Sequence, residues 1–186
     1  MTARASGSGS VRILAGRWKG RALQVPARAR PTSGRARGAL FDLLGERVAG
    51  ARVLDLFAGS GAVGLEAVSR GARSAVLVEP DGAAIARSLA RLSPAPQEVV
   101  LIARKAETAI RALDRNAERF DLIFADPPYA GELRTATLRA AARLLAPGGV
   151  LALQQDARRG APDVQDLVLL ELRAYGRNVF YFFAMR

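Results

Sequence analysis

Residues 52–64 read RVLDLFAGSGAVG, and this stretch sets the architecture expected for the whole chain. The first six residues are apolar except for Arg52 and Asp55, which is typical of a strand buried inside a sheet. The G-x-G-x-x-G that follows is typical of the tight turn between a strand and a helix. Together they predict the first strand–helix unit of a parallel sheet that has helices on both faces.

Strand-like and helix-like segments alternate along the rest of the chain. The predicted strands lie at 52–57, 74–79, 98–102, 120–125, 150–154, 167–172 and 178–184, the last two as a closing antiparallel pair. The predicted helices lie at 34–47, 62–70, 81–92, 105–115 and 132–145, and short runs at 11–14 and 21–25 predict a hairpin. We therefore expect a doubly wound α/β domain at 51–186, preceded by a flexible tail at 1–10 and a basic hairpin and helix at 11–50.

The composition of the 186 residues restricts the available chemistry. The absence of cysteine excludes disulfides, a thiolate zinc site and a cysteine nucleophile, and the absence of histidine excludes the imidazole base. No apolar run approaches the roughly 18 residues that span a bilayer, and no signal peptide is recognisable. We expect a cytoplasmic protein without metal or membrane partner, whose chemistry uses carboxylates, backbone groups, aromatic rings or a bound cofactor.

Positive charge is concentrated at the start of the chain. Residues 1–40 hold nine basic and no acidic residues, whereas the rest holds 19 basic and 17 acidic ones. Planar arginine guanidinium groups suit phosphate contacts, and an aromatic ring suits base stacking, so this segment predicts nucleic-acid binding. The residues expected to contact RNA are Arg12, Arg17, Trp18, Lys19, Arg21, Arg30 and Arg35.

The glycine turn has an acidic partner in the next strand. Glu79 ends that strand twenty residues after Gly59, where a carboxylate can accept hydrogen bonds from both hydroxyl groups of a ribose. Asp55, four residues before Gly59, would repel the pyrophosphate of a dinucleotide at this turn. S-adenosylmethionine carries an ammonium and a sulfonium, so an acid at this point favours that cofactor over NAD.

The tetrapeptide 126–129, Asp-Pro-Pro-Tyr, follows the carboxyl end of the strand at 120–125. Two prolines hold the backbone extended and remove two N–H donors, which leaves carbonyl groups and Asp126 as a cluster of acceptors beside Tyr129. Such a cluster fits the exocyclic amine of a planar base: it accepts hydrogen bonds from the two N–H groups while the nitrogen lone pair attacks a methyl group. Asp126, Pro127, Pro128 and Tyr129 are thus the predicted catalytic corner.

Four groups of residues carry a resemblance to a known family. They are 11–21 (VRILAGRWKGR), 30–33 (RPTS) with 39–41 (ALF), 55–67 (DLFAGSGAVGLEA), and the Asp-Pro-Pro-Tyr corner. On these residues nearly the whole chain resembles the bacterial 16S rRNA guanine-N2 methyltransferases, the RsmD family of class I S-adenosylmethionine-dependent enzymes.

The resemblance implies a monomer with a seven-stranded, Rossmann-like sheet. It also implies methyl transfer to a guanine N2 of 16S rRNA, either as naked RNA or within the small ribosomal subunit, including an assembly intermediate. Segment 30–32 would close over the methionine end of the cofactor. The residues expected to bind the cofactor are Asp55, Phe57, Ala58, Gly59, Ser60, Gly61, Glu79, Pro80, Lys105, Ala106, Asp126 and Thr32.

The chain departs from the usual family pattern at three places. Gly34 and Gly38 stand where acids are usual, Lys105 lies near the expected adenine site, and glutamines occupy 154 and 155. These departures leave open a non-catalytic, cofactor-binding rRNA-assembly factor of the same fold. A DNA adenine-N6 methyltransferase is a second alternative, and a nucleotide-dependent oxidoreductase a third, disfavoured by Asp55.

Overall fold

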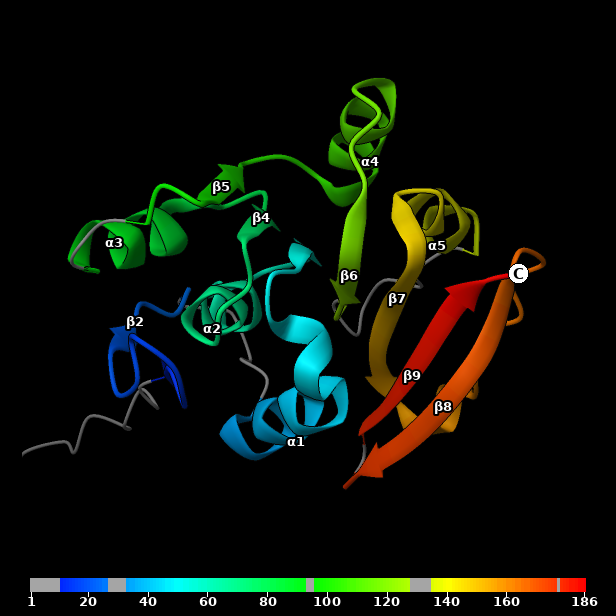
Figure 1. Cartoon of the computed structure of the whole chain (residues 1–186), viewed down its shortest axis with the longest axis horizontal. Coiled ribbons are helices and arrows are strands. Elements are labelled where there is room, and N and C mark those ends of the chain that lie inside the picture. Colours follow the sequence, from blue (N-terminus) through cyan, green and yellow to red (C-terminus); the bar gives the residue numbers. More distant parts are fainter. Residues whose placement is uncertain (1–10, 27–32, 93–95, 128–134, 177) are drawn as a thin grey trace, which may run out of the picture.

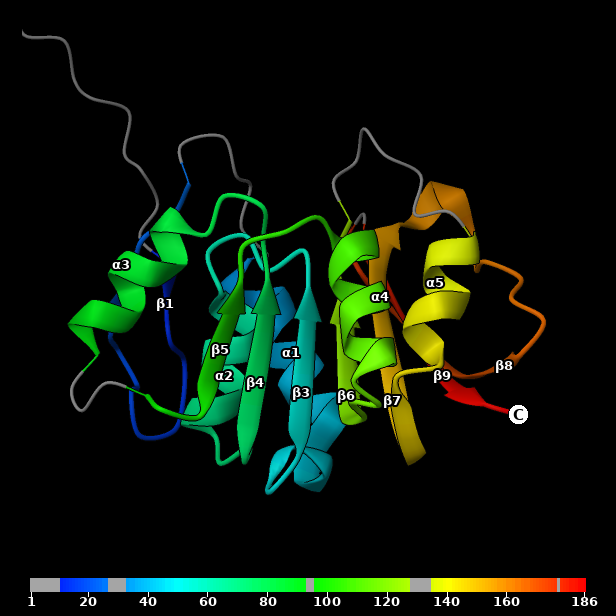
Figure 2. The same ribbon diagram turned by 90° about the horizontal axis from the view of Figure 1, so that it is seen from above.

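The computed structural model describes residues 11–26, 33–92, 96–127, 135–176 and 178–186, which form a central sheet with helices on both sides (Figures 1 and 2). The strands are β1 Val11–Arg12, β2 Ala22–Leu23, β3 Arg52–Leu56, β4 Ser74–Val78, β5 Val99–Ile102, β6 Phe120–Ala125, β7 Leu145–Asp156, β8 Leu167–Tyr175 and β9 Asn178–Met185. The helices are α1 Gly34–Leu44, α2 Ala62–Ser69, α3 Ala83–Arg91, α4 Ala106–Arg115 and α5 Thr135–Ala142, with 3₁₀ turns at Gly45–Val48 and Ala157–Arg159. None of the described helices has the length and apolar character needed to cross a membrane.

The large sheet has seven strands in the order β5-β4-β3-β6-β7-β9-β8. Strands β3 to β7 pair in parallel, and β9 lies antiparallel between β7 and β8. The expected seven-stranded, mostly parallel sheet is confirmed. The chain runs outward from β3 through β4 to β5, then crosses back to β6 on the other side of β3. The carboxyl ends of β3 and β6 therefore border the crevice where open α/β sheets bind ligands.

Side-chain alternation in β3 divides its residues between two apolar cores. Val53 packs in the core that contains α1, α2 and α3, whereas Leu54 and Leu56 pack in the core that contains α4 and α5. The two sets of helices lie on opposite faces of the sheet (Figure 2). Because successive strand residues point to opposite faces, Asp55 shares the face of Val53 and lies beneath the start of α2.

The predicted hairpin exists and is packed into the core beside α1 and α2. Ile13, Trp18 and Leu23 are at most 4% exposed and belong to the same cluster as the apolar residues of α1. Backbone N–H groups of the hairpin donate to Ser69 at the end of α2 and to Ser88 of α3, at 2.8–2.9 Å. The hairpin is thus fastened to two helices of the α/β fold and shares their core.

The largest error in the predicted boundaries lies between α5 and β7, where the strand expected at 150–154 begins already at Leu145. The helix expected over 132–145 ends at Ala142, and Leu145 already belongs to β7, where it pairs with Phe120. The pairing then shifts register before Leu122 pairs with Val150. Glycines 148 and 149 therefore lie inside an irregular stretch of the strand. The local Pro-Gly-Gly sequence is typical of the end of a helix, but pairing with β6 makes this segment part of β7.

Candidate functional site

Three carboxylates lie together at the carboxyl edge of the sheet. Asp55 belongs to β3, whereas Glu79 and Asp126 directly follow β4 and β6. Asp55 is 1% exposed, and its Oδ2 accepts the Gly64 N–H at 3.0 Å. Burial raises the pKa of Asp55 from 3.8 to about 7, the Gly64 hydrogen bond opposes this rise, and the negative charges of Asp126 and Glu79 add to it. The three predicted acids therefore share one local field, which favours a cationic ligand.

The loop between β3 and α2 begins with a strained residue. Phe57 has a φ of +76°, which is costly for a residue with a side chain. The N–H groups of Phe57 and Ala58 both donate to the Val78 carbonyl, at 3.1 and 2.9 Å, and the Gly61 N–H donates to the Ala58 carbonyl at 2.7 Å. Backbone hydrogen bonds to β4 and within the turn thus hold the loop in its unusual conformation.

The three glycines of the loop have different surroundings. Gly59 and Gly61 have φ of +55° and +75°, and a Cβ added at Gly59 would meet nothing within 4 Å. A Cβ at Gly61 would lie 3.3 Å from Ile85 and Leu77, and one at Gly64 would lie 2.0 Å from Leu77 Cδ2. In the usual G-x-G-x-x-G turn the second glycine lets a ligand approach the backbone, whereas in this structure the first glycine has the open side. The second and third glycines permit close packing of α2 against α3 and β4.

Glu79 is joined to the glycine loop. It is half-buried, and its Oε2 accepts the Gly59 N–H at 2.9 Å, which ties the end of β4 to the turn after β3. Its Oε1 accepts the Asp81 N–H at the longer distance of 3.4 Å. A carboxylate can accept several hydrogen bonds, so Glu79 retains acceptor capacity for hydroxyl groups of a ligand.

The other residues expected to bind the cofactor lie around this edge. Ala58 is half-buried, Ser60 is 5% exposed, and Pro80 is exposed just after Glu79. Lys105 is exposed at the N-terminus of α4, after edge strand β5, and Ala106 beside it is buried. Within the described part of the chain, no cluster of three or more acidic, histidine or cysteine side chains could hold a metal ion.

The predicted catalytic corner is described in part. Asp126 and Pro127 are half-buried directly after β6, and Pro127 has no N–H to compete for the carboxylate. Four predicted site residues lie outside the described residues: Pro128, Tyr129, Thr32 and Arg30.

The basic hairpin presents charge to solvent but does not present its tryptophan. Arg12, Lys19, Arg21 and Arg35 are exposed, and Arg17 is half-exposed with its guanidinium paired to Glu98. Trp18 is 4% exposed, because its ring fills the core between hairpin and helices, with Arg17 lying over it at 4.1 Å. The expectation that Trp18 stacks on a base is therefore corrected: the described hairpin presents cations to solvent, and the ring is structural.

The family model described as conserved hypothetical protein 95 matches residues 11–184. The chain belongs to this family. Ribosomal RNA small subunit methyltransferase D of Escherichia coli K12 is 37% identical over an alignment of 170 residues that covers 86% of this chain and 81% of that protein. A solved Escherichia coli protein, yhhF, described as a candidate methyltransferase, is 31% identical with a TM-score of 0.81 and covers 96% of this chain and 99% of its own. A solved hypothetical protein of Thermus thermophilus is 41% identical with a TM-score of 0.78, and covers 92% and 98%. The resemblance inferred from the motifs is confirmed.

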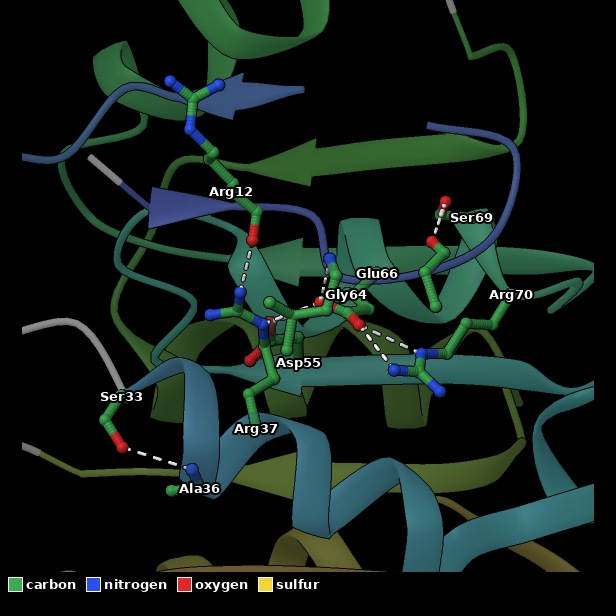
Figure 3. A network of polar contacts seen from close by, with 11 residues as sticks. Arg12, Ser33, Ala36, Arg37, Asp55, Gly64, Glu66, Ser69 and Arg70 are labelled. Atoms are coloured by element: carbon green, nitrogen blue, oxygen red, sulfur yellow. Dashed lines mark hydrogen bonds and ion pairs between the residues drawn. The ribbon is translucent and has the colours of Figure 1, made fainter. Parts of the chain in front are cut away.

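In this family member, sequence reasoning missed a buried charge cluster behind the glycine loop (Figure 3). Arg37 of α1 and Glu66 of α2 are 1% and 0% exposed, and Arg37 Nε lies 2.8 Å from Glu66 Oε2. A signal was present, because Arg37 shares the helical spacing of Leu40, Phe41 and Leu44, all of them buried. An arginine at a core position of an amphipathic helix predicts a buried acidic partner.

Proposed function

We propose that the chain is an S-adenosylmethionine-dependent rRNA methyltransferase that methylates the N2 amine of a guanine in 16S rRNA. The observation that carries the proposal is the acidic edge formed by Asp55, Glu79 and Asp126 beside the glycine loop. It occurs in a chain 37% identical to an enzyme named for methylating small-subunit ribosomal RNA.

The residues of this edge fit S-adenosylmethionine. The cofactor has an ammonium, a sulfonium and one carboxylate, so its net charge is positive and complements the field of the three acids. The open side of Gly59 lets a ligand approach the backbone, and Glu79 beside it has acceptor capacity for ribose hydroxyls. Asp55 and the loop 57–61 would then hold the methionine part, with Lys105 and Ala106 near the base.

Asp126 is the proposed catalytic residue. When bound, S-adenosylmethionine supplies a methyl group attached to a positively charged sulfur. The Asp126 carboxylate accepts a hydrogen bond from the guanine amine and orients the nitrogen lone pair toward that methyl group. After transfer the amine nitrogen is cationic and acidic, so its proton leaves to Asp126 or to water without a histidine base.

The exposed cations of the hairpin and α1 form the proposed RNA face. Arg12, Lys19, Arg21 and Arg35 are exposed on elements that share one apolar core with α2 and α3. Contacts between such cations and phosphates orient a nucleic acid without reading its sequence. We infer that this face holds the rRNA while the target base reaches Asp126.

Transfer of labelled methyl groups from S-adenosylmethionine to three acceptors tests the proposal. The acceptors are unmodified small ribosomal subunits, naked 16S rRNA and DNA, and the modified nucleoside is identified after digestion. We expect N2-methylguanosine in rRNA. Label in DNA adenine would instead show that the chain is a DNA adenine-N6 methyltransferase. Cofactor binding without any label would favour the non-catalytic alternative.

Two variants assign the catalytic role. Asp126→Asn should lower transfer by about 10²-fold or more while cofactor binding persists, because a neutral amide oxygen is a weaker hydrogen-bond acceptor for the amine than a carboxylate and leaves water as the proton acceptor. Asp163→Asn removes a carboxylate from an exposed loop position and serves as the matched control. Normal turnover by Asp126→Asn would refute the assignment.

A further inference from the structure

The buried charge cluster behind the glycine loop joins three elements that belong to different parts of the proposed site (Figure 3). Glu66 Oε2 accepts hydrogen bonds from Arg37 Nε at 2.8 Å and from the Leu14 N–H at 3.2 Å. Its other oxygen accepts from Arg70 Nη2 at 2.8 Å. One carboxylate in α2 thus binds the hairpin through Leu14 and helix α1 through Arg37.

Arg37 lies between residues of the RNA face and the helix of the cofactor loop. Its Nη2 donates to the backbone carbonyl of Arg12, whose own side chain is exposed. Arg35, two residues earlier in α1, is exposed as well. On the other side of the same turn of α2, the Gly64 N–H bonds Asp55 in the acidic edge. A single guanidinium therefore connects two proposed RNA contacts to the helix that begins at the glycine loop.

Stability alone does not account for this cluster. Taking two charged groups out of water is costly, and apolar residues of similar volume often replace a buried ion pair without loss of stability. Arg37 Nη1 is also buried without a hydrogen-bond partner among the residues that the structure describes, which adds to the cost. What the ion pair provides, and apolar packing does not, is a directional contact that sets the position of one element against another.

We propose that Arg37, acting through Glu66, is a positioning residue that fixes the RNA face relative to the cofactor loop. The inference rests on the proposed function, since it concerns how far the target base lies from the methyl donor. Displacement of reacting groups by about 1 Å can lower a rate by about 10²-fold, so loss of this contact should reduce transfer without touching either ligand.

The double variant Arg37→Met/Glu66→Met separates positioning from stability. It removes both buried charges of the pair together. Arg70 loses its Glu66 partner, but its side chain is 23% exposed and can be hydrated, so the variant should melt close to the wild type. We expect its kcat on rRNA to fall by about 10²-fold while its affinity for S-adenosylmethionine stays at the wild-type value. Arg37→Lys keeps the charge and one donor and should recover part of the rate. Arg52→Met, which breaks the ion pair with Glu118 at the opposite end of β3, is the matched control.

Hydrogen exchange gives a readout that does not depend on turnover. In the double variant the Leu14 amide and the first turn of α1 should exchange faster, while the Gly64 amide in the first turn of α2 should keep its protection. A double variant that transfers methyl groups at the wild-type rate, or whose Leu14 amide stays protected, overturns the inference. So does a loss of activity accompanied by equal loss of cofactor affinity. If the wild type itself labels no RNA, the proposed function fails, and the exchange result alone still decides whether Arg37 positions the hairpin.

Discussion

Replacing Asp55 by asparagine should stabilise the folded chain at neutral and alkaline pH while it weakens cofactor binding. Asp55 is 1% exposed, and burial is the main reason that its pKa is raised from 3.8 to about 7. In the unfolded chain the carboxyl group returns to its ordinary pKa. Between about pH 4 and 7 the folded state therefore binds more protons than the unfolded state, and stability falls as the pH rises.

The size of the effect follows from the difference between the two pKa values. That difference is about three pH units, and each unit corresponds to about 1.4 kcal/mol, which gives about 4 kcal/mol. An asparagine has nearly the same shape, and its side-chain oxygen can still accept the Gly64 N–H, but it never ionises. The variant should gain nothing near pH 4, then about 1.4 kcal/mol per pH unit, and about 4 kcal/mol above pH 7.

Urea unfolding measures this gain. Trp18, the single tryptophan, is buried and provides a fluorescence probe of unfolding. Wild type, Asp55→Asn and the exposed control Asp163→Asn are unfolded at several values between about pH 4.5 and 8. A stability difference between Asp55→Asn and wild type that does not change with pH would refute the reasoning. Calorimetry at pH 8 should show weaker S-adenosylmethionine binding by the variant, since it lacks one charge of the acidic edge.

Three further predictions concern other parts of the site. Glu79→Ala should weaken cofactor binding more than Glu79→Gln, because only the glutamine can still accept the Gly59 N–H; equal affinities would exclude a role for that bond, and calorimetry decides. Gly64→Ala should destabilise the fold by about 1–3 kcal/mol in urea unfolding, since its Cβ would lie 2.0 Å from a leucine methyl of β4; an unchanged midpoint would contradict the close packing of α2. Lys19→Gln/Arg21→Gln should lower the slope of log affinity for RNA against log salt by about 0.7 for each lost phosphate contact, and an unchanged slope would remove these residues from the RNA face.

Local patterns in the sequence predicted most of the fold because parallel α/β proteins repeat a local rule. Apolar strands, glycine turns and amphipathic helices alternate within short windows, so the strands from β3 to β9 and all five helices could be predicted within a few residues. The α5–β7 boundary failed for the opposite reason. There, pairing with Phe120 across the sheet draws Leu145 into a strand, and no window around Pro147 contains that partner.

The candidate site also has features that the local sequence predicts and features that only tertiary packing decides. Glycine spacing, and acids in or just after three predicted strands, assigned Asp55, Glu79 and Asp126 to one cofactor site. They meet there because parallel strands end on the same side of their sheet. Which glycine has the open side could not be predicted, since it depends on how Ile85 and Leu77 pack around Gly61.

By itself, then, the sequence determined the α/β class, the acidic edge beside a glycine turn and the family. The tertiary structure alone decided which groups are removed from water. Trp18 and Arg37 belong to segments that read as surface for nucleic acid, yet the hairpin and α1 pack on α2 and enclose both. The raised pKa of Asp55 has the same origin, because burial changes the free energy of a charge through neighbours that are distant along the chain.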